Sequence, residues 1–168
     1  MHVDVARHFQ SKDFILKLLD VMALYKLNKF HFHLTDDEAW RLEIPGLEEL
    51  TEVGGKRCHD LDETTCIIPQ LGSGPGTGDS GSGFYTVKDY EQILRYANDR
   101  GIEVIPEVDM PGHCHAVVKA MEARYYRLVD SDPVAAAEYL LSDLNDTSKY
   151  LSEQYFRYAL PSNNAYQI

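Results

Sequence analysis

Apolar positions in the first part of the chain switch between strand and helix spacing. Residues 2–6 alternate polar and apolar, as a short strand does. Over residues 14–23 apolar side chains recur every three or four positions, the spacing of one helical face, with Ser11 or Asp13 as the N-cap. Residues 30–34 predict a second strand, with both phenylalanines on one face and both histidines on the other. The pattern predicts a β-α-β unit.

A second helical stripe and a third strand follow further along the chain. Thr86 and Asp89 have the spacing of a capping box, and the apolar stripe after them continues to Gly101, a residue that commonly ends helices. Residues 102–108 read as a strand, and a Pro-Gly turn leads into an Ala-rich helical pattern over residues 115–123. Strand and helix thus alternate three times, which predicts an α/β fold with a parallel sheet and right-handed crossovers.

The rest of the chain has weaker periodicity. Residues 45–83 predict a long loop, with a Gly/Ser-rich stretch at 70–83. Helical patterns cover residues 132–141 and 150–160, and residues 161–168 predict an irregular end. We therefore expect one domain over residues 1–160.

Composition narrows the class of protein. A length of 168 residues with a hydrophobic share of 44% fits one globular domain. No stretch reaches the roughly 18 to 20 apolar residues of a membrane span, and the first residues lack the pattern of a signal peptide. The net charge of −11 would repel a phosphate backbone, so we expect no nucleic-acid partner.

Polar residues follow each predicted strand. Arg7 and His8 follow the first, residues 35–38 (Thr-Asp-Asp-Glu) the second, and Asp109 and His113 the third. Each could be a surface ion pair or a helix cap. Three such ends at the carboxyl edge of one parallel sheet instead predict a functional site, because α/β enzymes keep their chemistry at that edge.

Two chemistries fit these residue types. His31 and His33 point the same way on a strand, and with His113, His115 and nearby carboxylates they could hold a divalent metal in a metal-dependent hydrolase. The alternative is carboxylate chemistry on a sugar. There Arg7 and Asp36 would grip hydroxyl groups, and Asp109 with His113 would tune a neighbouring acid.

Three motifs resemble the family 20 glycoside hydrolases, the β-N-acetylhexosaminidases and chitobiases. They are residues 4–9 (Asp-Val-Ala-Arg-His-Phe), 31–41 (His-Phe-His-Leu-Thr-Asp-Asp-Glu-Ala-Trp-Arg) and 107–113 (Glu-Val-Asp-Met-Pro-Gly-His). Their order and spacing also match, and the resemblance covers roughly residues 2–160. It implies a (β/α)₈ barrel in which the His-x-His strand is part of the wall, with no metal and no cofactor.

The resemblance also implies an activity and roles for single residues. Such enzymes remove terminal β-linked N-acetylglucosamine or N-acetylgalactosamine from oligosaccharides or glycoconjugates by a substrate-assisted retaining route, an exception to the two-carboxylate scheme. Arg7 would bind hydroxyls of the terminal sugar and Asp36 would support it, while Asp109 and His113 would hold and tune the catalytic glutamic acid. The family resemblance further implies a lysosomal or secreted protein.

One part of the family pattern is missing from these 168 residues. The catalytic Asp-Glu pair belongs to a His-x-Gly-Gly-Asp-Glu motif, which does not occur here. The Asp-Glu dipeptide at 37–38 belongs to the second-strand motif and the one at 62–63 lies in the predicted loop, so neither can take that role. A full barrel also needs roughly 250 residues. We therefore expect about the first three βα units of an unclosed barrel, inactive alone. The alternatives are a truncated isoform that only binds sugar or a partner and, more remotely, the metal-dependent hydrolase.

Two further signals bear on the compartment. Cys58 and Cys66 lie eight residues apart in the predicted loop and could form a disulfide in an oxidising compartment, the alternative being two free thiols. Residues 145–147 (Asn-Asp-Thr) match a glycosylation sequon.

Overall fold

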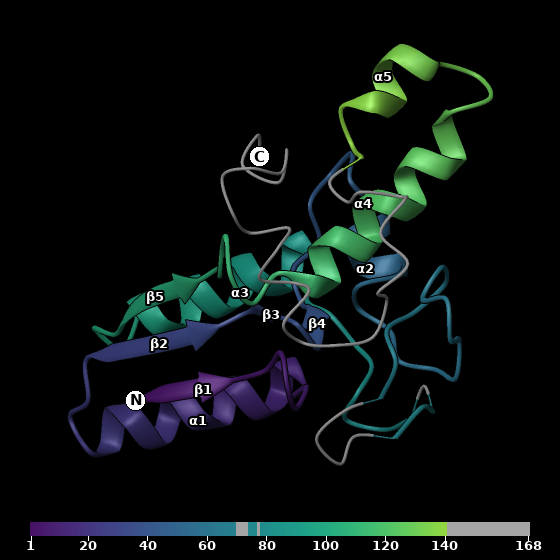
Figure 1. Cartoon of the computed structure of the whole chain (residues 1–168). Helices are drawn as coiled ribbons and strands as arrows, with labels where there is room; N and C mark the ends of the chain where they lie inside the picture. The colour runs from purple at the N-terminus through teal and green to yellow at the C-terminus, as the bar shows by residue number, and fades with distance from the viewer. Residues whose placement is uncertain (70–73, 77, 141–168) are drawn as a thin grey trace.

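The computed structural model describes residues 1–69, 74–76 and 78–140 (Figure 1). Its strands are β1 (His2–Asp4), β2 (Lys29–His33), β3 (Thr35–Asp36), β4 (Ala39–Trp40) and β5 (Glu103–Glu107). Its helices are α1 (Lys12–Leu24), α2 (Glu49–Glu52), α3 (Val87–Asn98), α4 (His115–Leu128) and α5 (Pro133–Ala137). The three predicted strand–helix pairs correspond to β1–α1, β2–α3 and β5–α4.

An open, parallel sheet is formed by β1, β2 and β5, with β2 in the centre. The register places His33 of β2 opposite Asp4 of β1 and Glu107 of β5. Side chains at one level of neighbouring parallel strands point to the same face, so these three residues share a face. The predicted parallel order is confirmed, and each of these three strands lies within two residues of its predicted bounds.

The opposite face of the sheet is packed against helices. Phe30 and Phe32 of β2 are fully buried there, in a core whose other members include Ile15, Leu19, Met22, Ile93 and Ala97 of α1 and α3. Figure 1 shows α1 beside β1 and α3 beside β5. Burying one large apolar side chain stabilises a fold by about 1.5–3 kcal/mol. The Phe-His alternation of β2 therefore fixes which face receives the helices and which carries polar chemistry.

Local signals set the helix ends as expected. Ser11, rather than Asp13, caps α1 by accepting a hydrogen bond from the Phe14 N–H at 3.3 Å. Thr86 and Asp89 form the reciprocal capping box of α3. Gly101 follows α3 with φ of +66°, a backbone conformation that a residue with a Cβ adopts only at a cost.

Short elements occur where the sequence predicts none. β3 and β4 form an antiparallel hairpin, and α2 lies inside the predicted loop of residues 45–83. Trp40 of β4 is buried in a second apolar cluster that also includes residues from α2 and α4. The expectation of an irregular 45–83 segment is therefore wrong at α2, because a helix of four residues is too short to show a helical period.

Two helix bounds also differ from expectation. The predicted helix over 115–123 extends to Leu128, because Arg124 in its added turn pairs with Glu49 of α2 at 2.8 Å. α5 ends at Ala137, short of the predicted residue 141. The predicted helix over 150–160, the sequon and the end at 161–168 lie outside the described residues. None of the helices in the described ranges is long and apolar enough to cross a membrane.

The guanidinium of Arg41 holds the loops beneath the sheet edge. Arg41 is fully buried, and its nitrogens donate hydrogen bonds of 2.8 to 3.2 Å to five backbone carbonyls, those of Val5, Ala6, Gly55, Gly81 and Gly83. Burial, together with the neighbouring Arg57 cation, lowers the pKa of Arg41 to about 9, so the group stays charged at neutral pH. One side chain thereby satisfies carbonyls from three separate segments.

Replacing Arg41 should destabilise the chain strongly. In Arg41→Met the five carbonyls lose the Arg41 donors, although Ala6 keeps Arg57, and we expect the free energy of unfolding to fall by about 3–5 kcal/mol. Urea unfolding followed by circular dichroism measures the change. The matched control is Arg95→Ala, which removes only an exposed pair with Glu91 and should cost about 0.5 kcal/mol or less. Equal losses in the two variants would contradict the role assigned to Arg41.

Candidate functional site

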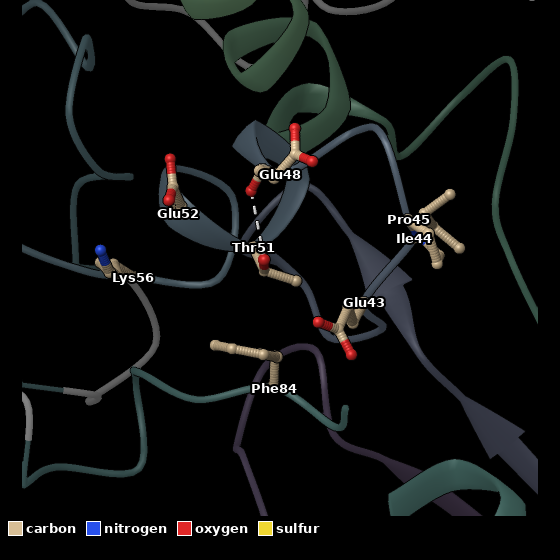
Figure 2. A pocket seen from close by; sticks show the side chains of 8 residues that line it. All are labelled: Glu43, Ile44, Pro45, Glu48, Thr51, Glu52, Lys56 and Phe84. Carbon is tan, nitrogen blue, oxygen red and sulfur yellow. Dashed lines mark hydrogen bonds between the residues drawn. The ribbon is translucent and has the colours of Figure 1, made fainter. Parts of the chain in front are cut away.

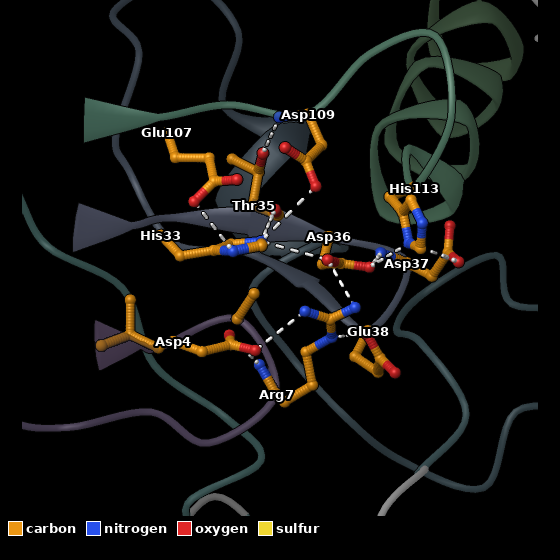
Figure 3. Close-up of polar contacts among 12 residues, drawn as sticks. Asp4, Arg7, His33, Thr35, Asp36, Asp37, Glu38, Glu107, Asp109 and His113 are labelled. Carbon is orange, nitrogen blue, oxygen red and sulfur yellow. Dashed lines mark hydrogen bonds and ion pairs between the residues drawn. The ribbon is translucent and has the colours of Figure 1, made fainter. Parts of the chain in front are cut away.

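Side chains from the ends of β1, β2 and β5 meet around Arg7 (Figure 3). The Arg7 guanidinium contacts three carboxylates: Nε lies 2.8 Å from Glu38, Nη1 lies 2.8 Å from Asp4, and Nη2 lies 2.6 Å from Asp36. The backbone N–H of Arg7 also donates to Asp4 at 3.1 Å. Charge-assisted contacts of this kind are the strongest hydrogen-bonding contacts in proteins. The plane of the guanidinium is therefore fixed before any ligand arrives.

Asp36 links Arg7 to the rest of the site. Its side chain is 1% exposed. One oxygen faces Arg7 and also lies 3.0 Å from Nε2 of His33. The other accepts a hydrogen bond from the Asp37 N–H at 2.7 Å and lies 3.1 Å from Nδ1 of His113. A buried carboxylate needs such partners, and Asp36 takes them from β2 and both neighbouring loops.

His33 connects Asp36 to the end of β5. Its Nδ1 lies 3.2 Å from Glu107, and its Nε2 lies 3.6 Å from a carboxylate oxygen of Asp109. The same Nε2 is 2.8 Å from the carbonyl of Thr35. Figure 3 shows the His33 ring between the two carboxylates of the β5 end and Asp36. His33 is thus an organising group of the site.

The segment after β5 turns His113 back over the hairpin. The Asp109 N–H donates to the hydroxyl of Thr35 at 3.1 Å, and the Met110–Pro111 peptide bond is cis. His113 has φ of +57°, which is uncommon for a residue with a Cβ and is found where the surrounding structure enforces it. Its ring contacts Asp36 and lies 3.7 Å from Asp37, while more than half of the side chain stays exposed.

All four residues predicted for the site lie at this edge. The structure pairs Arg7 with Asp36 and Asp36 with His113. Asp109 and His113, both described, do not form an ion pair or hydrogen bond with each other, since Asp109 faces His33 and His113 faces Asp36. The turn at 110–112 separates them. Their joint support of a glutamic acid stays a prediction.

The electrostatics of the site separate its carboxyl groups. Burial raises the pKa of Asp109, with Glu107 and Asp36 adding to the rise and His33 opposing it. Burial also raises the pKa of Glu38, although Arg7 opposes this. Burial alone would raise the pKa of Asp4, but its hydrogen bonds from Arg7 outweigh burial and lower it. The site therefore contains carboxyl groups shifted in opposite directions, a common property of functional sites.

Several His and carboxylate groups lie close enough to hold a cation. Among the described residues the ligand atoms of three sets come within 4.8 Å: His33 with Asp36 and Asp109; Asp36 with Asp37 and His113; and His2 with His31 and Glu107. No set joins the four histidines considered from the sequence. His115 is instead buried against Glu63, with Nε2 2.8 Å from the carboxylate. The donor types would suit a divalent cation, but the same atoms also form ion pairs and hydrogen bonds with one another.

A separate concavity lies away from this cluster (Figure 2). It has a volume of about 350 Å³ and is lined by Glu43, Ile44, Pro45, Glu48, Thr51, Glu52, Lys56 and Phe84. Within it the Thr51 hydroxyl donates to the carbonyl of Glu48 at 3.2 Å. None of the residues predicted for the site lines it, so it is distinct from the strand ends.

Sequence reasoning did not identify three members of the site. The sequence places Glu38 in the polar group at the end of the second strand but gives it no role, while Asp4 and Glu107 occur only within the family motifs. Strand alternation is the signal in the sequence: Glu107 stands two residues after Ile105 on the same face of β5, and it lies opposite His33. Asp4 likewise stands opposite His33 in the register of β1. A search for polar residues at one level of the sheet would have found both.

An open parallel sheet with an Arg–carboxylate cluster at its carboxyl edge is typical of an α/β enzyme domain. Comparison with known proteins specifies the class. Residues 1–159 match the catalytic domain of glycosyl hydrolase family 20, and the chain belongs to that family, as its motifs predicted.

Relatives cover the same part of the chain. It is 57% identical over 158 residues to a beta-hexosaminidase of Vibrio vulnificus and 59% identical over 155 residues to an N,N'-diacetylchitobiase of Vibrio harveyi. These matches cover 94% and 92% of this chain but 19% and 18% of the relatives, so the chain spans about a fifth of their length.

A solved structure also resembles the chain. The family 20 exo beta-N-acetylglucosaminidase of Vibrio harveyi, in complex with N-acetylglucosamine, matches with a TM-score of 0.65 and 45% identity. The match covers 73% of this chain and 18% of that one. The likeness therefore extends to the backbone.

The opposite pKa shifts predict an order of titration. On acidification Asp109 should take up its proton above the ordinary value of 3.8 and Asp4 below it. The stabilisation from Asp4 is present above its unfolded-state pKa and is lost as pH falls through its lower folded pKa. For Asp109 the sign is reversed, and stability falls as pH rises through the shifted range. Carboxyl ¹³C NMR titration measures both groups.

A variant tests the cause of these shifts. In Arg7→Gln the pKa of Asp4 should rise, because its charge-assisted contacts are lost, while that of Asp109 should change little. Arg100→Gln, which removes a surface pair with Asp20, is the control. Titration of Asp4 above Asp109 in the unmodified chain would contradict the electrostatics described.

Proposed function

We propose that this chain supplies the first three strand–helix units of a family 20 (β/α)₈ barrel and one side of a β-N-acetylhexosaminidase active site. The ion pair between Arg7 and Asp36, 2.6 Å long and set at the carboxyl edge of the sheet, is the observation that carries the proposal. It joins two of the family motifs across two strands. In barrel enzymes this edge faces the substrate.

The proposed substrate is a terminal β-linked N-acetylhexosamine. Arg7 and its carboxylates offer hydrogen-bond donors and acceptors in fixed positions, which is what recognition of sugar hydroxyls requires. In the substrate-assisted route the acetamido oxygen of the sugar attacks the anomeric carbon, and a glutamic acid gives its proton to the leaving oxygen. We assign the holding and tuning of that glutamic acid to His113, which is exposed next to Asp36, and to Asp109, whose raised pKa supports the assignment.

That glutamic acid is not supplied by a matching motif within these 168 residues. We therefore propose that the 168-residue chain alone does not turn over substrate and that further βα units complete the site. We also propose an oxidising compartment, lysosomal or extracellular. A disulfide between Cys58 and Cys66, whose Cα atoms are 5.8 Å apart, supports it.

A chimera tests the proposal. The 155 matching residues of the Vibrio harveyi N,N'-diacetylchitobiase are replaced by this chain, and hydrolysis of a chromogenic N-acetylglucosaminide is measured. We expect turnover by the chimera and none by the 168-residue chain. In the chimera, Arg7→Lys should lower kcat/KM by about 100-fold, about 2.7 kcal/mol, because lysine cannot hold three carboxylates in one plane.

The control is Arg100→Lys in the same chimera, which should leave kcat/KM within about twofold because Arg100 pairs with Asp20 on the surface. Turnover by the 168-residue chain alone would overturn the proposal that the proton donor comes from elsewhere. A folded chimera in which Arg7→Lys has no effect would remove Arg7 from sugar binding. Calorimetric heat from N-acetylglucosamine with the 168-residue chain would favour a sugar-binding isoform, and we expect none at millimolar sugar.

A further inference from the structure

Glu63 is a buried carboxylate outside the site described above. It is 5% exposed, and both of its oxygens are engaged. One lies 2.8 Å from Nε2 of His115, and the other accepts a hydrogen bond from the Ile68 N–H at 2.9 Å. Burial would raise the pKa of Glu63, but the contact with His115 outweighs it and lowers the pKa. A charged group is therefore kept inside the fold by its contact with a fully buried imidazole.

The loop that carries Glu63 is closed and strongly constrained. Cys58 and Cys66 join its ends through a disulfide. Inside it a single oxygen of Asp60 accepts hydrogen bonds from the backbone N–H and the hydroxyl of both Thr64 and Thr65. Glu63 itself has φ of +52°. A non-glycine residue keeps this conformation only when its surroundings enforce it, and such residues cluster where placement matters.

His115 connects this loop to the site. It is the first residue of α4, two positions after His113, and its backbone N–H donates to Asp37 at 3.1 Å. The other oxygen of Asp37 lies 3.7 Å from the ring of His113. Glu63 therefore holds the imidazole of the same residue whose amide holds Asp37. A continuous set of contacts runs from the disulfide loop to His113 and Asp36.

We propose that Glu63 is a positioning residue, which fixes His115 and through it the placement of Asp37 and His113 at the strand ends. The Cys58–Cys66 loop is the brace that keeps Glu63 in place. The inference rests on the proposed function only for its consequence, namely that breaking the brace would misplace His113 around the substrate. The placement itself can be measured without substrate.

Hydrogen exchange in the 168-residue chain tests the inference. The His115 amide should exchange at least about 10-fold faster in Glu63→Ala than in the unmodified chain, because its α4 turn loses the anchor. Glu63→Gln keeps an acceptor at the same reach and should restore slow exchange. Glu63→Asp keeps the charge but is one methylene shorter, so it should not restore slow exchange of the His115 amide. The ring signals of His113 should move in the Ala and Asp variants only.

Amides in the core distinguish positioning from general stability. Those of Phe32 and Ile93 should keep their exchange rates in each folded variant, and Glu52→Gln, an exposed glutamate on α2, should change none of them. Reducing the Cys58–Cys66 disulfide in the unmodified chain should also accelerate His115 exchange, a test that stands even if Glu63→Ala does not fold.

Three results would overturn the inference. They are unchanged His115 exchange in Glu63→Ala, uniform acceleration of core amides, or slow His115 exchange in Glu63→Asp together with fast exchange in Glu63→Gln. A failure of the chimera to hydrolyse sugar would leave these exchange rates as they are. The two proposals therefore fail separately.

Discussion

The buried guanidinium of Arg41 is the interaction on which the sheet edge and its site depend. Two of its five carbonyl acceptors belong to Val5 and Ala6, immediately before Arg7. A second buried arginine, Arg57, donates to the carbonyl of Ala6 as well. Because the backbone after β1 is irregular, its carbonyls have no strand partner and would be unsatisfied without these donors. Only arginine carries enough donors in one plane to satisfy several carbonyls at once. The position of Arg7 in the site is therefore set by two buried arginines that donate to the backbone just before it.

The larger elements could be predicted from the sequence because each repeats a pattern several times. The Phe-His alternation of β2 and the apolar stripe of α3 are such patterns, and the capping box of Thr86 is complete within four residues. The hairpin β3–β4 and helix α2 could not be predicted, since they have two residues per strand and four residues in the helix. They are stabilised by burial of Trp40 and by contacts of Glu49 with Arg124, which come from distant parts of the chain.

The candidate site could likewise be predicted from the sequence only in part. That Arg7, Asp36, Asp109 and His113 gather at one edge follows from parallel strand order, which the sequence shows. Which of them touch does not follow from it. His113 meets Asp36 instead of Asp109 because it follows the turn at 110–112 with a left-handed backbone, and no spacing rule states this. The contact between Glu63 and His115 joins residues 52 positions apart, and only the folded loop reveals it.

The ring of carboxylates around Arg7 has an electrostatic consequence. Asp4, Asp36 and Glu38 bring three negative charges to one positive charge, and Asp37, Glu107 and Asp109 stand close by. Arg41 and Arg57 also interact with Asp4 and Glu38, so the negative charge of the cluster is shared among three arginines. The cohesion of this edge is therefore electrostatic as well as geometric, and raising the salt concentration would weaken the part of it that solvent reaches.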